Sequence, residues 1–148
     1  MAIEGEYRPS TREFVREQVE AYERSDGREA NTFQDTGLPI IVVTMRGAKT
    51  GAVRKVPLMR VEHEGEYALV ASYGGRPAHP VWYWNLVTHP DDVELQDGSV
   101  RARFSVREVH GDERVQWWER AIAAYPPYAE YQERTDRVIP VFVASPSV

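Results

Sequence analysis

The 148-residue chain contains no cysteine, which excludes a disulfide, a thiolate metal site and a thiol nucleophile. No apolar run approaches the roughly 18–20 residues that a membrane-spanning helix needs. The longest run, IIVV at 40–43, is typical of a buried strand. The opening residues, MAIEGEYRPS, are too polar for a signal peptide. We therefore expect a cytoplasmic protein with no stable membrane insertion.

Several catalytic motifs are also missing. The four histidines, His63, His79, His89 and His110, are scattered without the spacing of a metal site, so no metal is expected. The sequence has no GxSxG nucleophile elbow and no GxGxxG dinucleotide fingerprint. These absences count against a zinc enzyme, an α/β-hydrolase and a Rossmann dehydrogenase.

Lysine is scarce, and both lysines, Lys49 and Lys55, lie in one basic segment. Residues 36–61 hold five basic side chains and no acidic one, whereas the remainder of the chain carries a net charge of −10. A positive segment on a chain of net charge −5 favours a small anionic ligand over a nucleic acid. A solvated charged face is the alternative, and it stays open.

Lys49-Thr50 resembles the end of a phosphate-binding P-loop, but the rest of that motif is absent. GxxxxGK[ST] requires glycines where this chain has Val43 and Ala48, and the residues that follow are typical of a strand rather than a helix. An NTPase is therefore excluded. A basic hairpin loop remains, in which Lys49, Thr50 and Arg54 can bind an anionic oxygen. An ordinary basic hairpin is the alternative.

The remaining pattern predicts helices at the start, middle and end of the chain, with hairpin-linked strands between them. Helices are expected over 10–24, 81–89, 112–125 and 128–135. Strands are expected over 38–46, 53–61, 67–72 and 138–143, with a further hairpin around the DGS turn at 97–99. Pro57 inside the second strand predicts a strand edge, a strand end or a bulge.

About six strands, joined mostly by hairpins and without regular helix alternation, argue against a parallel doubly wound sheet. We expect an α+β fold, in which N-terminal, middle and C-terminal helices decorate a small, mostly antiparallel barrel. Residues 1–37 are expected to supply the first helix and a connector, and residues 38–148 the barrel, in a single domain overall.

Two further segments combine glycine turns or helix breaks with aromatic side chains. In VASYGGRPAHPVWYWNL (70–86) a strand ends at Ser72, and two glycines allow the backbone to approach a flat ligand. In AAYPPYAEY (123–131) three tyrosines recur every three residues and can line a hydrophobic pocket. A plain glycine turn and ordinary core packing are the alternatives.

Taken in order, GAKTGAVRKVPL, VASYGGRPAHPVWYWNL and YPPYAEYQERTDRVIPVFV resemble the deazaflavin-dependent nitroreductase and quinone reductase family, which uses coenzyme F420. The resemblance runs from about Ile40 to Val143. It implies a split β-barrel related to the FMN-binding split barrels. It also implies hydride transfer from the reduced deazaflavin to a small hydrophobic electron acceptor, namely a quinone, an activated enone or a nitroaromatic.

By the same resemblance, the first segment binds the phosphate and acidic tail of the cofactor, and the second faces the deazaflavin. The residues that it implies for cofactor binding are Lys49, Thr50, Arg54, Pro57, Ala71, Ser72, Gly74, Gly75, Val81, Trp82 and Asn85. Ser72, Tyr125, Tyr128 and Tyr131 are the candidate catalytic residues, because a hydrogen-bond donor should meet the charge that builds on the acceptor oxygen.

Three alternatives stay open. An FMN-dependent split-barrel oxidoreductase would share the barrel and also need a phosphate site. A deazaflavin carrier would bind the cofactor without oxidising it, and an interaction module would need no cofactor. A homodimer is open as well, because barrels of this kind often pair. The sequence does not name the physiological acceptor, since a hydrophobic pocket discriminates weakly between flat substrates.

Overall fold

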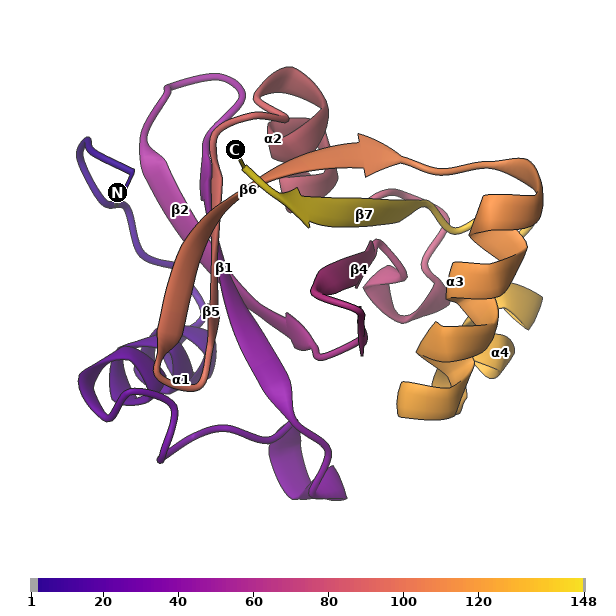
Figure 1. The fold of residues 1–148 in the computed structure, drawn as a ribbon, viewed down its shortest axis with the longest axis horizontal. Coiled ribbons are helices and arrows are strands. Elements are labelled where there is room, and N and C mark those ends of the chain that lie inside the picture. The colour runs from indigo at the N-terminus through magenta and orange to yellow at the C-terminus, as the bar shows by residue number, and fades with distance from the viewer. Residues whose placement is uncertain (1–2, 148) are drawn as a thin grey trace.

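The computed structural model describes residues 3–147, which form a curled antiparallel sheet with helices around it (Figure 1). Within this range the helices are α1 (Glu13–Arg24), α2 (Val81–Thr88), α3 (Gly111–Ala124) and α4 (Pro127–Glu133), with two 3₁₀ turns, η1 (Gln34–Thr36) and η2 (Tyr73–Gly75). The strands are β1 (Ile40–Arg46), β2 (Val53–Met59), β3 (Glu62–His63), β4 (Glu66–Val70), β5 (Val93–Asp97), β6 (Val100–Glu108) and β7 (Val141–Pro146).

The strand pairs of this sheet are all antiparallel, in the order β2-β1-β5-β6-β7-β4-β3. This arrangement confirms the predicted α+β split-barrel fold. The two predicted hairpins, β1–β2 and β5–β6, are both present. The described sheet has seven strands rather than the predicted six or so, because residues beside the HEGE turn form the two-residue strand β3.

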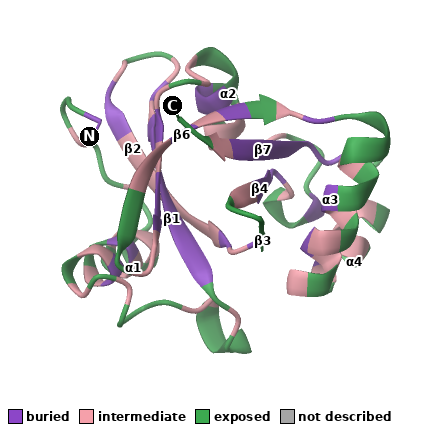
Figure 2. Ribbon diagram, viewed as in Figure 1, coloured by how far each residue is buried: buried purple, intermediate pink, exposed green. Residues whose placement is uncertain are grey.

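Strand side chains alternate between the two faces of the sheet and build two apolar clusters. One cluster holds Ile41, Val43 and Met45 of β1, and Leu86 of α2 packs into it. The other holds Ile40 and Val42, together with residues of α1, α3 and α4. β1 and β7 are buried along most of their length (Figure 2). Helices therefore cover both faces of the central strands.

The helices are short, and α1 packs on β2 while α3 packs on α4. Between residues 3 and 147, no helix is both long and apolar enough to cross a bilayer. The boundary expected at residue 37, between the connector and the barrel, stays a prediction.

β2 lies at one edge of the sheet, and its register with β1 decides which of its backbone groups are free. The Arg60 N–H donates to the Pro39 carbonyl, and the Gly47 N–H donates to the Ala52 carbonyl. These two bonds set the alternation of the antiparallel ladder. Even-numbered residues of β2 therefore bond to β1, and odd-numbered residues turn their backbone groups outward.

Within residues 3–147, neighbouring backbone bonds to the outward edge of β2 only at its two ends. Val53 bonds to Glu6 and Arg8, and the carbonyl of Val61, just beyond the strand, accepts from the Ala68 N–H. Between these ends, residues 55, 57 and 59 have no neighbouring strand in the described sheet. Pro57 has no N–H to leave unpaired there, which confirms its predicted place at a strand edge. We call residues 55–59 the edge window.

Candidate active site

Residues 56–59 of the edge window form one wall of a pocket of about 370 Å³. The other walls come from α1, the η2 turn, the start of α2 and the residues in and around α4. The residues selected from the sequence that line this pocket together are Pro57, Ser72, Gly74, Trp82, Tyr125, Tyr128 and Tyr131. The fold thus brings all three sequence segments to one cavity, although they are far apart along the chain.

The three tyrosines form a wall of hydrogen-bond donors. Tyr125 and Tyr128 are buried, and the hydroxyls of Tyr125 and Tyr131 lie 2.8 Å apart. Because one hydroxyl of that pair donates to the other, the second proton remains available to a ligand. Burial raises the pKa of Tyr125 and of Tyr128 well above the ordinary phenol value, so both side chains are neutral at pH 7.

The turn after β4 contributes Ser72 and Gly74 to the pocket, and it is an unusual piece of backbone. Tyr73, Gly74 and Gly75 all have positive φ, at 47°, 64° and 79°. A side chain at Gly74 would meet open space, whereas a Cβ at Gly75 would lie 2.5 Å from the Tyr131 carbonyl oxygen. Gly75 is buried and does not line the pocket. The absence of a side chain at Gly75 therefore lets the turn pack closely against the backbone of α4, rather than against a ligand in the pocket.

The residues that the resemblance implies around the deazaflavin differ in their position relative to this pocket. Ala71 is fully buried beneath the turn, and Val81 is 77% exposed; neither lines the pocket. Trp82 does line it. Asn85 is buried, and its Oδ1 accepts a hydrogen bond of 2.9 Å from the Ala48 N–H. Asn85 therefore holds the β1–β2 loop against α2.

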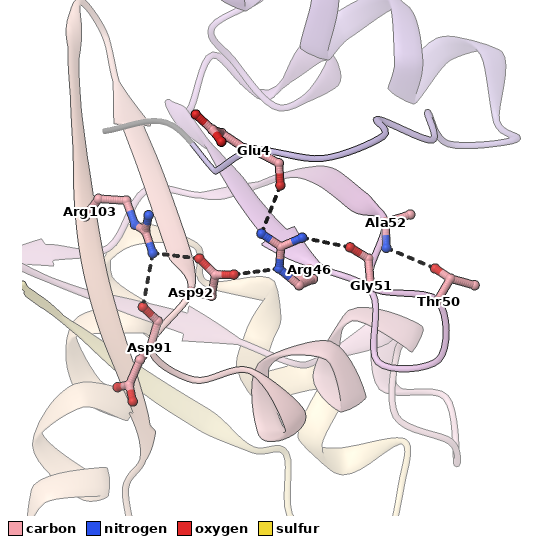
Figure 3. A network of polar contacts seen from close by, with 8 residues as sticks. All are labelled: Glu4, Arg46, Thr50, Gly51, Ala52, Asp91, Asp92 and Arg103. Atoms are coloured by element: carbon pink, nitrogen blue, oxygen red, sulfur yellow. Dashed lines mark hydrogen bonds and ion pairs between the residues drawn. The ribbon is translucent and has the colours of Figure 1, made fainter.

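A polar network holds the other side of that loop (Figure 3). The Arg46 guanidinium donates to the Gly51 carbonyl, to the Glu4 carbonyl and, at 2.6 Å, to the Asp92 carboxylate. Arg103 donates to the other oxygen of Asp92. Burial alone would raise the pKa of Asp92, but the hydrogen bond and charge of Arg46, with Arg103, lower it below its ordinary value. The loop is therefore fixed from both sides.

The basic segment is less positive in the fold than in the sequence. Arg46 is paired with Asp92, Lys55 with Glu23 at 2.6 Å and Arg60 with Asp97 at 2.9 Å. The acidic partners come from α1 and from the region around β5, so the sequence count of an acid-free segment overstated its free charge.

Lys49 and Arg54 are the two basic residues of this segment that make no ion pair within residues 3–147. Lys49 is exposed in the loop and Arg54 is half-buried on β2; neither lines the pocket. The Thr50 hydroxyl accepts from the Ala52 N–H and so shapes the loop. Among the described residues, no group of three His, Asp or Glu side chains is placed to hold a metal ion.

Sequence reasoning missed several contributors to the site, among them Phe14 and Arg137. Val19 and Tyr22 of α1 lie in the core, but Phe14 of the same helix is 57% exposed and lines the pocket. Arg137 lies between the three tyrosines and the last strand, where the sequence pattern suggests no role for it. Only the tertiary contacts distinguish these residues from ordinary helix and loop positions.

Residues 14–146 match the model of the F420H(2)-dependent quinone reductase family. The chain is 35% identical over 108 residues to an F420H(2)-dependent quinone reductase of Mycobacterium tuberculosis, covering 71% of this chain and 72% of the relative. Two solved structures are similar as well. One is described as an F420-H2 dependent reductase, with 54% identity, 72% and 94% coverage of the two chains and a TM-score of 0.69. The other is described as a domain-swapped dimer, with 47% identity, 92% and 100% coverage and a TM-score of 0.72.

The two glycines of the η2 turn allow a matched test of the turn geometry. Gly74→Ala is expected to lower the free energy of unfolding by about 1–2 kcal/mol, the cost of a left-handed alanine. Gly75→Ala is expected to cost about 3 kcal/mol or more, because its Cβ also meets the Tyr131 backbone. Urea unfolding of the free protein measures both values. Equal losses in the two variants would contradict the contact between the turn and α4.

Proposed function

This chain belongs to the F420H(2)-dependent quinone reductase family, and on that premise we propose that it reduces quinones in the pocket along the edge window. The family makes the protein an oxidoreductase that uses coenzyme F420, which confirms the prediction of this cofactor over FMN. The observation that carries the proposed site is the convergence of three distant sequence segments on one cavity. Activated enones and nitroaromatics are further proposed acceptors.

The residues around the pocket suit the cofactor that the family implies. Pro57, Met59 and Trp82 offer apolar surface to a flat ring system, and Gly74 leaves room beside them. The outward carbonyl of Pro57 and the outward backbone groups of Met59 can bond to polar atoms on the ring edge. We propose that the unpaired cations Lys49 and Arg54 bind the phosphate and acidic tail, because charge-assisted hydrogen bonds suit anionic oxygens.

Coenzyme F420, when reduced and bound, supplies a hydride to the acceptor, and the protein supplies orientation and electrostatics. We propose that the tyrosine wall donates a hydrogen bond to the acceptor oxygen as negative charge builds there. The free proton of the Tyr125–Tyr131 pair is the best-placed donor, because the two hydroxyls bond to each other and both residues line the pocket. Ser72, on the neighbouring turn, is the second candidate. Phe14 and Phe33 can exclude water from the acceptor side.

The oligomeric state and the cellular location complete this proposal. A similar solved structure is a domain-swapped dimer, which supports a homodimer for this chain too. The cytoplasmic location inferred from composition stays a prediction.

Removal of the unpaired cations tests the cofactor site. Lys49→Ala and Arg54→Ala are each expected to weaken F420 binding by about 1–3 kcal/mol, the scale of one hydrogen bond to a charged group. Titration of the cofactor fluorescence measures the dissociation constants, with FMN titrated in parallel as the competing cofactor.

Lys55→Gln is the matched control for these variants. It removes one positive charge from the same segment. Because Lys55 is already paired with Glu23, the affinity of this variant for F420 should equal that of the wild type. Unchanged affinity in both test variants, or tighter binding of FMN than of F420, would count against the proposed anchor.

Removal of single hydroxyls tests the donor wall. Tyr125→Phe, Tyr128→Phe, Tyr131→Phe and Ser72→Ala are compared for F420H2-dependent reduction of menadione. Loss of the donor that meets the acceptor oxygen should lower kcat/KM by about 100-fold, as for an oxyanion donor. Tyr83→Phe is the control, because its hydroxyl donates to Glu108 outside the pocket. If all four test variants keep wild-type kcat/KM, the tyrosine wall and Ser72 do not stabilise the acceptor.

A further inference from the structure

The guanidinium group of Arg137 donates hydrogen bonds to the backbone of the turn that carries Ser72 and Gly74. Its Nη1 donates to the Ala71 carbonyl at 3.0 Å, and its Nη2 donates to the Ser72 carbonyl at 2.9 Å. Its Nε and Nη2 donate to the Arg76 carbonyl at 3.2 and 3.1 Å. One side chain thus spans the turn from its first residue to its last.

The same guanidinium also contacts the ring of His79, with Nη1 lying 3.0 Å from Nδ1. Burial, and then the charge of Arg137, lower the pKa of His79, so the neutral ring can accept a hydrogen bond at Nδ1. His79 stacks on Tyr83 of α2, with ring centroids 4.1 Å apart. Arg137 therefore links the turn to α2 as well.

Arg137 is itself held in place from α4. Its N–H donates to Thr135 Oγ1 at 3.1 Å, and its carbonyl accepts from Gln132 Nε2 at 2.7 Å. The Gln132 side chain also accepts from the Ile139 N–H. A polar chain therefore runs from the helix that carries Tyr128 and Tyr131 to the turn that carries Ser72.

No carboxylate pairs with Arg137 within residues 3–147. Burial lowers the pKa of its guanidinium, which still remains charged at neutral pH. A half-buried cation whose partners are carbonyl oxygens is specialised for fixing backbone rather than for pairing charge.

The turn needs such support, because its backbone is strained. Tyr73 is a non-glycine residue with a φ of 47°, and two further left-handed residues follow it. The Ser72 carbonyl accepts from Gly75 as well as from Arg137, so the guanidinium reinforces the hydrogen bond that closes the turn. Strained conformations persist only where the surroundings fix them.

We propose that Arg137 is a positioning residue that holds Ser72, Gly74 and the neighbouring pocket wall in the conformation needed for turnover. This inference rests on the proposed function for its kinetic consequence, but the effect of Arg137 on the turn itself is independent of the cofactor. Arg137 does not line the pocket. It acts through the carbonyls of residues 71, 72 and 76.

Arg137→Met tests the turn in the free protein by amide hydrogen exchange. The control is Arg114→Met: Arg114 is also half-buried and donates to a main-chain carbonyl, that of Ile139, without touching the turn. Exchange of the amides in residues 72–79 should become about tenfold faster in Arg137→Met and stay unchanged in Arg114→Met, because only the first loses the bonds to the turn. Exchange in β1 should not change in either variant.

Kinetics then link the turn to turnover. In Arg137→Met, kcat/KM for F420H2-dependent reduction of menadione should fall by about tenfold or more. Added guanidinium at millimolar concentration should restore part of the lost kcat/KM, whereas the same concentration of urea should not. Arg137→Lys, which keeps the charge but cannot span four acceptors, should fall between wild type and Arg137→Met and serves if the Met variant does not fold. Any one of four results would overturn the proposal. In Arg137→Met these are unchanged amide exchange in the turn, a wild-type kcat/KM, or no recovery of kcat/KM with guanidinium. The fourth is an equal loss of kcat/KM in Arg114→Met.

The wild-type protein separates this inference from the proposed function. If wild type fails to oxidise F420H2 with menadione, the function is wrong, and the exchange result still decides whether Arg137 holds the turn. If wild type is active and Arg137→Met matches it, only the inference is wrong.

Discussion

The unpaired edge of β2 is the constraint on which the site depends. A strand edge normally presents bare N–H and C=O groups that invite another strand. Here the N-terminal segment covers one end of the edge at Val53, and the chain folds back on itself at Val61. Among the described residues, only the edge window is left uncovered, and Pro57 at its centre has no N–H to satisfy. The split in the barrel is therefore also the place where a flat ligand can lie against the sheet.

The other parts of the site are positioned around this window by polar contacts to backbone. Arg46 and Asn85 fix the β1–β2 loop, and Arg137 fixes the turn after β4. Each of these side chains bonds to the backbone of, or beside, a residue that the sequence had suggested for ligand contact. Lys49, Thr50 and Ser72 thus lie on loops whose backbone is fixed from inside the protein.

The sequence predicted the local elements well, because hydrophobic alternation, glycine turns and proline are local signals. It predicted the β1–β2 hairpin, the DGS turn and the helices around residues 85 and 118 to within a few residues. The charge count failed for a physical reason: Glu23 and Asp97 are remote in sequence from Lys55 and Arg60 and meet them only in the fold. The role of Gly75 was missed in the same way, since the backbone of Tyr131 that restricts it is 56 residues away.

The most direct test of the account is the hydrogen-exchange footprint of coenzyme F420 on the wild-type protein. If the pocket along β2 is the cofactor site, binding should slow exchange of the outward amide of residue 59 and of the amides in the turn at residues 72–76. Amides that already bond to β1, at residues 54, 56 and 58, should change little. Protection centred instead on the groove between Arg60 and Arg120, with none along the edge window, would contradict the account.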